Sequence, residues 1–192
     1  MAALSDEFYS YLITDPQFYS SDSTIFRQKL AQALSNHKVS MACFRDKTSP
    51  NFEELAISFL ETCADFGVKK TFINQRVDIA HKLKANGVHL TSRQFDEIKN
   101  AKSLGLEVFI SCHTTQEIEF AQSLGVNFAT ISPIFRSPNK GEPIGIEILQ
   151  EAKKILKTTK LIALGGIDTK EKVEIIKSSD ADGFASIRYF AN

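Results

Sequence analysis

The sequence predicts an α/β fold, a compact (β/α)8 barrel of the TIM type with a reduced eighth helix. Short β-rich apolar runs alternate strictly with longer segments of helical periodicity, and the alternation passes through eight units. Apolar strands separated by amphipathic helices are typical of a parallel sheet that helices cover. A doubly wound open sheet satisfies the same pattern, but eight units favour the closed barrel. The chain has 192 residues, whereas such barrels typically need about 250, so loops must be short.

The expected elements follow one another with few residues between them. Strands are expected at residues 11–14, 39–44, 70–74, 87–90, 107–111, 127–131, 160–164 and 183–187. Helices are expected between them at residues 24–35, 51–66, 75–85, 92–103, 115–124, 146–157 and 169–178. Only a few residues follow the last strand, which is why the eighth helix is reduced. Residues 5–10 are expected to add a helical turn at the bottom of the barrel.

Local signals support the helix boundaries. Phe26, Leu30 and Leu34 recur at helical spacing and predict one buried stripe. Pro50-Asn51 is a start signal, because proline suits the first turn of a helix and asparagine caps it. Gly67 is a stop signal, since glycine readily adopts the left-handed conformation after a helix.

Composition excludes several function classes. Lys and Arg together number 23, as do Asp and Glu, so no net charge favours nucleic acid or an anionic membrane. No apolar run approaches the roughly 20 residues that span a bilayer, and the N-terminus lacks a signal-peptide pattern. We therefore expect one domain over residues 1–192, a cytoplasmic location, and neither a nucleic-acid nor a membrane partner. The oligomeric state stays open, a homo-oligomer included.

Two cations leave the expected second strand on alternate positions. The side chains of Arg45 and Lys47 can therefore point in the same direction, and function in such barrels gathers at the C-terminal ends of strands. The planar fork of Arg and the point charge of Lys together suit a diphosphate. A surface ion pair with Asp46 is the structural alternative.

The longest expected connection, residues 132–145, also carries residues suited to phosphate. Ser137, Asn139 and Lys140 bring small polar groups and a cation to this loop. An ordinary crossover loop is the alternative interpretation.

A pair of glycines directly follows the seventh strand. Gly165 and Gly166 allow backbone N–H groups to approach an anion, as at the phosphate sites common after barrel strands seven and eight. Arg188 lies just beyond the eighth strand, near the same corner. These three residues predict a second phosphate-binding position.

Other catalytic arrangements lack support. Ser111 and His113 do not form a nucleophile pair with an orienting carboxylate, so triad hydrolysis is not expected. His89 lies inside a short strand, where a packed and hydrogen-bonded histidine is the more common outcome. The dinucleotide-binding and P-loop glycine motifs are absent. The three cysteines are scattered and lack zinc-site spacing, so we expect structural thiols.

Eight segments, in this order, resemble the thiamine phosphate synthase/TenI family: YLITD, CFRDK, FINQRVDIA, GVHL, ISCHT, SPIFRSPNKG, ALGGI and ADGFASI. They extend over nearly the whole chain. The resemblance implies a compact (β/α)8 barrel and an enzyme, a thiamine phosphate synthase-like transferase in thiamine biosynthesis. Such synthases use Mg2+ and join hydroxymethylpyrimidine diphosphate to thiazole phosphate. Diphosphate leaves first, and the thiazole nitrogen then captures the pyrimidine carbocation.

The resemblance also implies roles for individual residues. Those expected to act in catalysis are Arg45, Lys47, Ser111 and Lys140. Those expected to bind substrate are Asn74, Ser137, Asn139, Gly165, Gly166 and Arg188. The cations match contacts to the pyrimidine diphosphate, and the two glycines match a backbone cradle for the thiazole phosphate. Arg188 replaces a small residue of the family, so it either binds that phosphate or obstructs the usual pose.

The chain departs from the family at the positions implied to hold magnesium. Gln75 and Gln94 stand where synthases carry aspartates, and neutral amides are much poorer Mg2+ partners than carboxylates. Mg2+ is therefore a cofactor of the family and a doubtful one here. Arg93 is a candidate for supplying charge in its place. The sister branch, which tautomerises thiazoles, uses a histidine where this chain has Pro133, so that activity lacks its proton carrier.

Three functional hypotheses remain open. The first is a synthase-like transferase with altered or weakened metal use, and its motivation is the retained cations and glycines. The second is a diverged barrel that binds a phosphorylated thiamine-pathway ligand without synthase chemistry, and its motivation is the missing carboxylates. The third is an isomerase or lyase that acts on an unrelated phosphorylated substrate.

Overall fold

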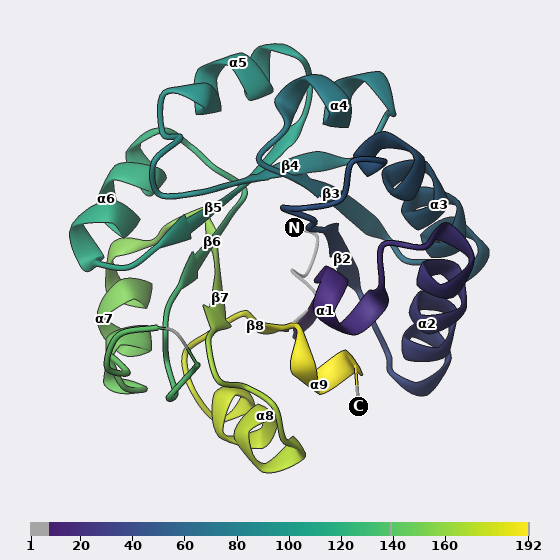
Figure 1. Cartoon of the computed structure of the whole chain (residues 1–192). Coiled ribbons are helices and arrows are strands. Elements are labelled where there is room, and N and C mark those ends of the chain that lie inside the picture. Colours follow the sequence, from purple (N-terminus) through teal and green to yellow (C-terminus); the bar gives the residue numbers. More distant parts are fainter. Residues whose placement is uncertain (1–7, 139, 192) are drawn as a thin grey trace, which may run out of the picture.

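Eight strands form a closed barrel in the computed structural model, which describes residues 8–138 and 140–191 (Figure 1). The strands are β1 Tyr9–Ile13, β2 Met41–Phe44, β3 Lys70–Asn74, β4 Gly87–Leu90, β5 Glu107–Cys112, β6 Phe128–Ile131, β7 Lys160–Leu164 and β8 Gly183–Ser186. Each strand pairs in parallel with the next, and β8 pairs with β1 to close the barrel. The fold is therefore the predicted (β/α)8 barrel rather than an open doubly wound sheet.

Helices surround the barrel in the order that the sequence predicts (Figure 1). They are α1 Pro16–Tyr19, α2 Ser23–Asn36, α3 Phe52–Asp65, α4 Val77–Lys82, α5 Glu97–Ser103, α6 Thr115–Ser123, α7 Glu147–Ile155, α8 Lys170–Lys177 and α9 Arg188–Ala191. The helix after the last strand, α9, has four residues. This short helix confirms the reduced eighth helix.

Two expectations at the N-terminal end are corrected. Tyr9 and Ser10 lie in β1, where they pair with Gly183 and Phe184 of β8, so they do not belong to a helical turn. Residues 5–7 of that expected turn lie outside the described residues. The short helix α1 was not predicted, although Asp15 caps it and Pro16 begins it.

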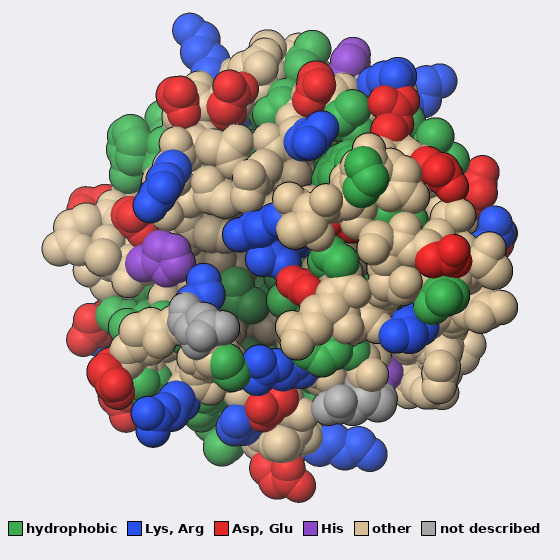
Figure 2. Space-filling view, viewed as in Figure 1, with side chains coloured by type: hydrophobic (Ala, Val, Ile, Leu, Met, Phe, Trp, Pro, Cys, Tyr) green, Lys and Arg blue, Asp and Glu red, His purple; other side chains and the backbone are tan. Residues whose placement is uncertain are grey.

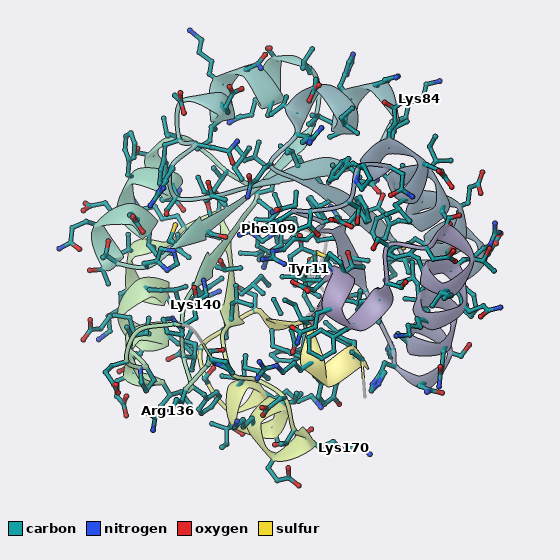
Figure 3. All side chains as sticks on the ribbon, viewed as in Figure 1. Tyr11, Lys84, Phe109, Arg136, Lys140 and Lys170 are labelled. Carbon is teal, nitrogen blue, oxygen red and sulfur yellow. The ribbon has the colours of Figure 1, made fainter. Side chains whose placement is uncertain are left out.

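Side chains of the strands alternate between two apolar cores. Tyr11, Phe72 and Phe109 belong to the core inside the barrel. The rings of Tyr11 and Phe109 stack there with centroids 4.5 Å apart (Figure 3). Neighbouring positions such as Leu12 and Ile110 point outward and pack under the helices. The aromatic side chains fill the middle of the barrel, so they form a packed floor beneath the C-terminal ends of the strands.

Within the described part of the chain, no helix is both long enough and apolar enough to cross a membrane.

Candidate functional site

A cavity of about 550 Å³ opens at the C-terminal end of the barrel, and every strand or the residues directly after it contribute to its wall. Asn139, one of the ten predicted site residues, lies outside the described residues. The other nine all line this cavity, and they are Arg45, Lys47, Asn74, Ser111, Ser137, Lys140, Gly165, Gly166 and Arg188. Figure 2 shows Lys and Arg side chains around the hollow at the centre of this face.

Arg45 is held at the end of β2 by residues at the end of β1. Its backbone N–H donates to Thr14 Oγ1 at 2.9 Å, and the Thr14 hydroxyl donates back to the Arg45 carbonyl at 3.2 Å. The guanidinium forms an ion pair with Asp15, and the two side chains are only 25% and 23% exposed. Asp15 also accepts from the Gln17 N–H as the cap of α1. The carboxylate of Asp15 therefore orients Arg45 and neutralises part of its charge.

Lys47 and Lys140 reach the same cavity from the loops after β2 and β6. The charge of Arg45, partial burial and the charge of Lys140 lower the pKa of Lys47, and Asp15 offsets this only in part. Asp46 instead accepts hydrogen bonds from the backbone of its own turn, including the Thr48 N–H at 2.9 Å. Lys47 therefore lies at the cavity wall as a cation and does not form a surface ion pair with Asp46.

The ends of β3 and β4 are tied together at another edge of the cavity. The Asn74 side-chain amide donates to the His89 carbonyl at 3.1 Å, and the Gln75 N–H donates to the same oxygen at 2.9 Å. Gln75 has φ 66°, in the left-handed region that residues with a side chain seldom adopt. Asn74 and Gln75 thus both line the cavity and both hold its wall in place.

His89 connects the barrel interior to the cavity. Its Nδ1 lies 3.0 Å from the Tyr11 hydroxyl, and its Nε2 lies 3.0 Å from Ser111 Oγ. Burial, together with the charge of Arg45, lowers the pKa of His89 to about 3, so the ring is neutral near neutral pH. The expectation of a packed, hydrogen-bonded histidine is confirmed, and the structure adds that one of its partners is the predicted site residue Ser111.

The side chain of Gln94 forms hydrogen bonds to the backbone beside the cavity. Its Nε2 donates to the Gln75 carbonyl at 3.1 Å. Its Oε1 accepts from both the backbone N–H and the hydroxyl of Thr91, at 3.2 and 3.1 Å. Neighbouring Arg93 is exposed and is not among the residues that line the cavity, so the structure does not support it as a replacement for metal charge.

The glycine pair after β7 lies against the loop that follows β6. A Cβ on Gly165 would lie 2.6 Å from Pro133 Cα, and one on Gly166 would lie 2.5 Å from the Arg136 carbonyl. Both glycines have positive φ, 104° and 69°. The Phe135 N–H donates to the Gly165 carbonyl at 3.0 Å. Because these two residues have no side chain, the loop that carries Ser137 and Lys140 can pack directly against them. The sequence did not reveal this role of the glycines.

The β6–α7 loop places its residues unequally. Ser137 and Lys140 line the cavity, whereas Arg136 is exposed and does not. Figure 3 shows Lys140 nearer to the barrel axis than Arg136. The loop therefore brings one cation, not two, to the site.

The corner near β8 combines Arg188, the first residue of α9, with Asp168. Asp168 forms an ion pair with Lys172 at 2.7 Å, and Lys172 also donates to the Gly166 carbonyl at 2.8 Å. Lys172 is thus the partner that neutralises Asp168 and steadies the glycine turn. Arg188 remains a cavity-lining cation of this corner.

Sequence reasoning missed three kinds of contributor. Asp15 is predictable as a polar residue at the end of the first expected strand, but its role as the cap of α1 and partner of Arg45 was not predicted, although Pro16 after it is a helix-start signal. Gln17 and Phe18 of α1 also line the cavity, but four residues are too short for a periodicity signal. Tyr11 shows no sequence sign of its contact with His89.

His113 is the remaining histidine at the cavity wall. Its Nδ1 lies 3.0 Å from the Ser132 carbonyl oxygen and 3.3 Å from the Ser132 hydroxyl, so Ser132 fixes the orientation of this ring. Pro133, where the sister branch of the family has a histidine, also lines the cavity and has no group that could carry a proton.

The described residues do not fit a magnesium site. They include no group of three His, Cys, Asp or Glu side chains that could hold a metal ion. The two carboxylates of the cavity wall, Asp15 and Asp168, each form an ion pair with a cation. Gln94 uses its carbonyl oxygen, the only atom of its amide that could bind a metal, for Thr91. Gln75 and Gln94 therefore do not reproduce the donor set that Mg2+ prefers.

Solved structures share this architecture. A thiamine phosphate pyrophosphorylase from Pyrococcus furiosus superposes with a TM-score of 0.79 at 23% identity, over 95% of this chain and 86% of the other. An N-acetylmannosamine-6-phosphate 2-epimerase from Clostridium perfringens superposes with a TM-score of 0.72 at 14% identity, over 95% and 87%. At these identities the matches show the fold alone.

Sequence comparison finds relatives of higher identity than these solved structures. A thiamine-phosphate synthase of Syntrophomonas wolfei is 30% identical over 191 residues, covering 96% of this chain and 88% of the relative. A thiamine-phosphate synthase of Albidiferax ferrireducens is 30% identical over 184 residues, covering 92% and 81%. The family model described as thiamine monophosphate synthase matches residues 10–190. The chain therefore belongs to the thiamine monophosphate synthase family.

Proposed function

We propose that this protein is a transferase of thiamine biosynthesis that joins hydroxymethylpyrimidine diphosphate to thiazole phosphate. The observation that carries the proposal is the convergence of Arg45, Lys47 and Lys140 on one cavity that is also bordered by Gly165-Gly166. Family membership supports the same reaction, because the relatives at 30% identity are thiamine-phosphate synthases.

The proposed chemistry depends on stabilising a leaving group. The bond between the pyrimidine methylene carbon and the diphosphate oxygen breaks, and its electron pair leaves with pyrophosphate. The thiazole nitrogen then donates its lone pair to that carbon and forms the new C–N bond. Arg45, Lys47 and Lys140 oppose the charge that develops on pyrophosphate, and preorganised charge of this kind is usually the largest contribution to catalysis. No step is assigned to a metal ion, because the residues present do not fit one.

The remaining residues are proposed to bind and orient the substrates. Ser111 lies beside the neutral His89, so its hydroxyl can donate to an oxygen of the diphosphate. The glycine turn and Arg188 border the position proposed for the thiazole phosphate. Ser137 and Asn74 line the wall between these charged groups and contribute neutral donors.

The direct test is turnover. Purified protein is incubated with both substrates, in one arm with excess EDTA and in another with Mg2+, and thiamine phosphate and pyrophosphate are quantified. We expect both products in equal amounts, and a Lys140→Met variant that folds normally should lose most of the activity. If neither arm yields thiamine phosphate above a protein-free control, the proposed reaction is wrong.

A second candidate function is binding without turnover. The observation that favours it is the replacement of the metal carboxylates by Gln75 and Gln94. The side-chain amide of Gln94 is already hydrogen-bonded to the backbone of Thr91 and Gln75. Saturable binding of thiamine phosphate with no turnover in either arm would establish this alternative. If calorimetry detects no affinity for any of the phosphorylated ligands, the binding function fails as well.

A further inference from the structure

We infer that the cavity holds the diphosphate of its ligand with arginine and lysine alone, without a divalent cation. This inference rests on the proposed function for the identity of the ligand, and it departs from the metal use that the family implies. Three features of the described residues carry it: lining cations without an ion-pair partner, repulsion between neighbouring cations, and neutral glutamines at positions 75 and 94, with the Gln94 amide bonded to Gln75 and Thr91.

The first feature is the excess of positive charge. Four cations line the cavity, Arg45, Lys47, Lys140 and Arg188, against the carboxylates of Asp15 and Asp168. Asp15 pairs with Arg45, while the partner of Asp168 is Lys172, which does not line the cavity. Among the described residues, no ion pair is formed by the other three lining cations. An anionic ligand is the partner that this wall lacks.

The second feature is repulsion between the cations. The charge of Arg45 is the largest cause of the lowered pKa of Lys47, followed by burial and the charge of Lys140. Arg45 and Lys47 after β2 lie near Lys140 of the β6–α7 loop, and the repulsion between these three positive charges costs free energy. A bound diphosphate removes the repulsion and gains charge-assisted hydrogen bonds. A metal ion bound at the same wall would instead bring further positive charge close to these cations.

The third feature is the use made of the two glutamines. Gln94 links the carbonyl of Gln75, after β3, to the N–H and hydroxyl of Thr91, after β4. Both ends of its amide are occupied, and the link joins two segments that border the cavity. An aspartate would be one methylene shorter, would lack the donor for Gln75, and would add negative charge beside the anion. In the family these two positions supply metal ligands. In this chain they supply a neutral structural link.

The experiment uses inorganic pyrophosphate as the probe and the whole chain as it exists. Isothermal titration is carried out in excess EDTA and, separately, in millimolar Mg2+. We expect saturable binding in EDTA that is at least as tight as in Mg2+, because Mg2+ also complexes free pyrophosphate. Binding that is tenfold or more tighter in Mg2+, or that is absent in EDTA, would overturn the inference.

Variants identify the groups that do the binding. Lys47→Met and Lys140→Met should each weaken pyrophosphate binding in EDTA by about tenfold, the range of one charge-assisted hydrogen bond. Lys170→Met is the matched control, because Lys170 is exposed at the start of α8, outside the cavity lining (Figure 3). Equal affinities of the three folded variants would show that pyrophosphate binds elsewhere and would refute the assignment.

The outcomes separate this inference from the proposed function. Pyrophosphate binding in EDTA with no thiamine phosphate in any turnover arm would refute the reaction and leave the metal-free anion site standing. Turnover and pyrophosphate binding that both require Mg2+ would refute the inference and leave the reaction standing.

Discussion

His89 Nε2 lies 3.0 Å from Ser111 Oγ, while Nδ1 of the same ring lies 3.0 Å from the Tyr11 hydroxyl. A neutral imidazole offers one donor and one acceptor, so two tautomers satisfy these contacts. When Tyr11 donates to Nδ1, Nε2–H donates to Ser111, and the Ser111 hydroxyl is free to donate into the cavity. This is the arrangement that suits an anionic ligand, and it makes His89 a positioning residue for Ser111.

We expect the ligand to select that tautomer. In the presence of pyrophosphate, nitrogen NMR of labelled protein should show His89 protonated at Nε2 and unprotonated at Nδ1. A hydrogen on Nδ1 in the complex would contradict the proposed direction of the Ser111 hydroxyl. The signals of exposed His81 provide an internal reference.

Stability should fall below neutral pH because of His89. Its pKa is about 3 in the folded protein and about 6.5 in an unfolded chain. Between these values the unfolded state binds the extra proton, so the free energy of unfolding decreases as pH falls, by up to about 1.4 kcal/mol per pH unit. Urea denaturation at pH 7 and pH 5 should show a smaller pH-dependent loss for His89→Gln than for the wild type. Identical losses would place the proton uptake on other groups.

Kinetic coupling should link Ser111 and His89. If the protein is active as proposed, Ser111→Ala should lower kcat by about 100-fold, as for the loss of one donor to a developing oxyanion. His89→Gln should lower kcat less, and the double variant should be no worse than Ser111→Ala alone, because both changes remove one hydrogen-bonded unit. Fully additive losses would show that the two residues act independently.

The glycine turn should be intolerant of a methyl group. Gly166→Ala forces φ 69° on a residue with a side chain and brings Cβ within 2.5 Å of the Arg136 carbonyl. We expect a loss of about 1–3 kcal/mol in stability and weaker phosphate binding, because the loop with Lys140 must move. Gly105→Ala is the matched control, since its φ is also positive at 76° but nothing lies within 4 Å. If both variants bind pyrophosphate as the wild type does, docking of the loop does not organise the site.

Introducing carboxylates at positions 75 and 94 should make pyrophosphate binding depend on Mg2+. The Gln75→Asp, Gln94→Asp double variant adds negative charge beside the cations and breaks the link between Gln94 and Gln75. Pyrophosphate binding in EDTA should therefore weaken about tenfold or more. Mg2+ should recover much of that affinity, since carboxylates and phosphate oxygens are its preferred ligands. No recovery at saturating Mg2+, with the fold intact, would show that the rest of the wall has also diverged.

Lys47 should be unusually reactive. Because Arg45 and Lys140 lower its pKa, a larger fraction of Lys47 is deprotonated at a given pH than for an ordinary surface lysine. Limited acetylation at pH 8.5 followed by mass spectrometry should modify Lys47 faster than exposed Lys170, and pyrophosphate should protect it. Equal rates at the two lysines with no protection would contradict the crowding of charges at the cavity.

Much of the fold could be predicted because the relevant signals are local. The bounds expected for β3, β4 and β7 match those observed, since these short apolar runs lie between helix stops and starts within a few residues. Helices α4 and α5, Val77–Lys82 and Glu97–Ser103, begin later than expected because loops that border the cavity take up their first residues. Helix α4 also ends earlier than expected, and Lys84 beyond it has φ 57°, which is not helical. The cavity position of Arg45 was likewise predictable from its place at a strand end.

The sequence alone determined the alternation of eight strands with helices, and with it the rim on which the polar residues lie. Tertiary structure decided how those residues meet. Tyr11 and His89 are 78 positions apart, and the Gln94 link and the loop docked on Gly165 also join separate segments. The physical reason is that periodicity records only which face of an element is apolar. Hydrogen bonds across the barrel depend on strand register and closure, which no single segment encodes.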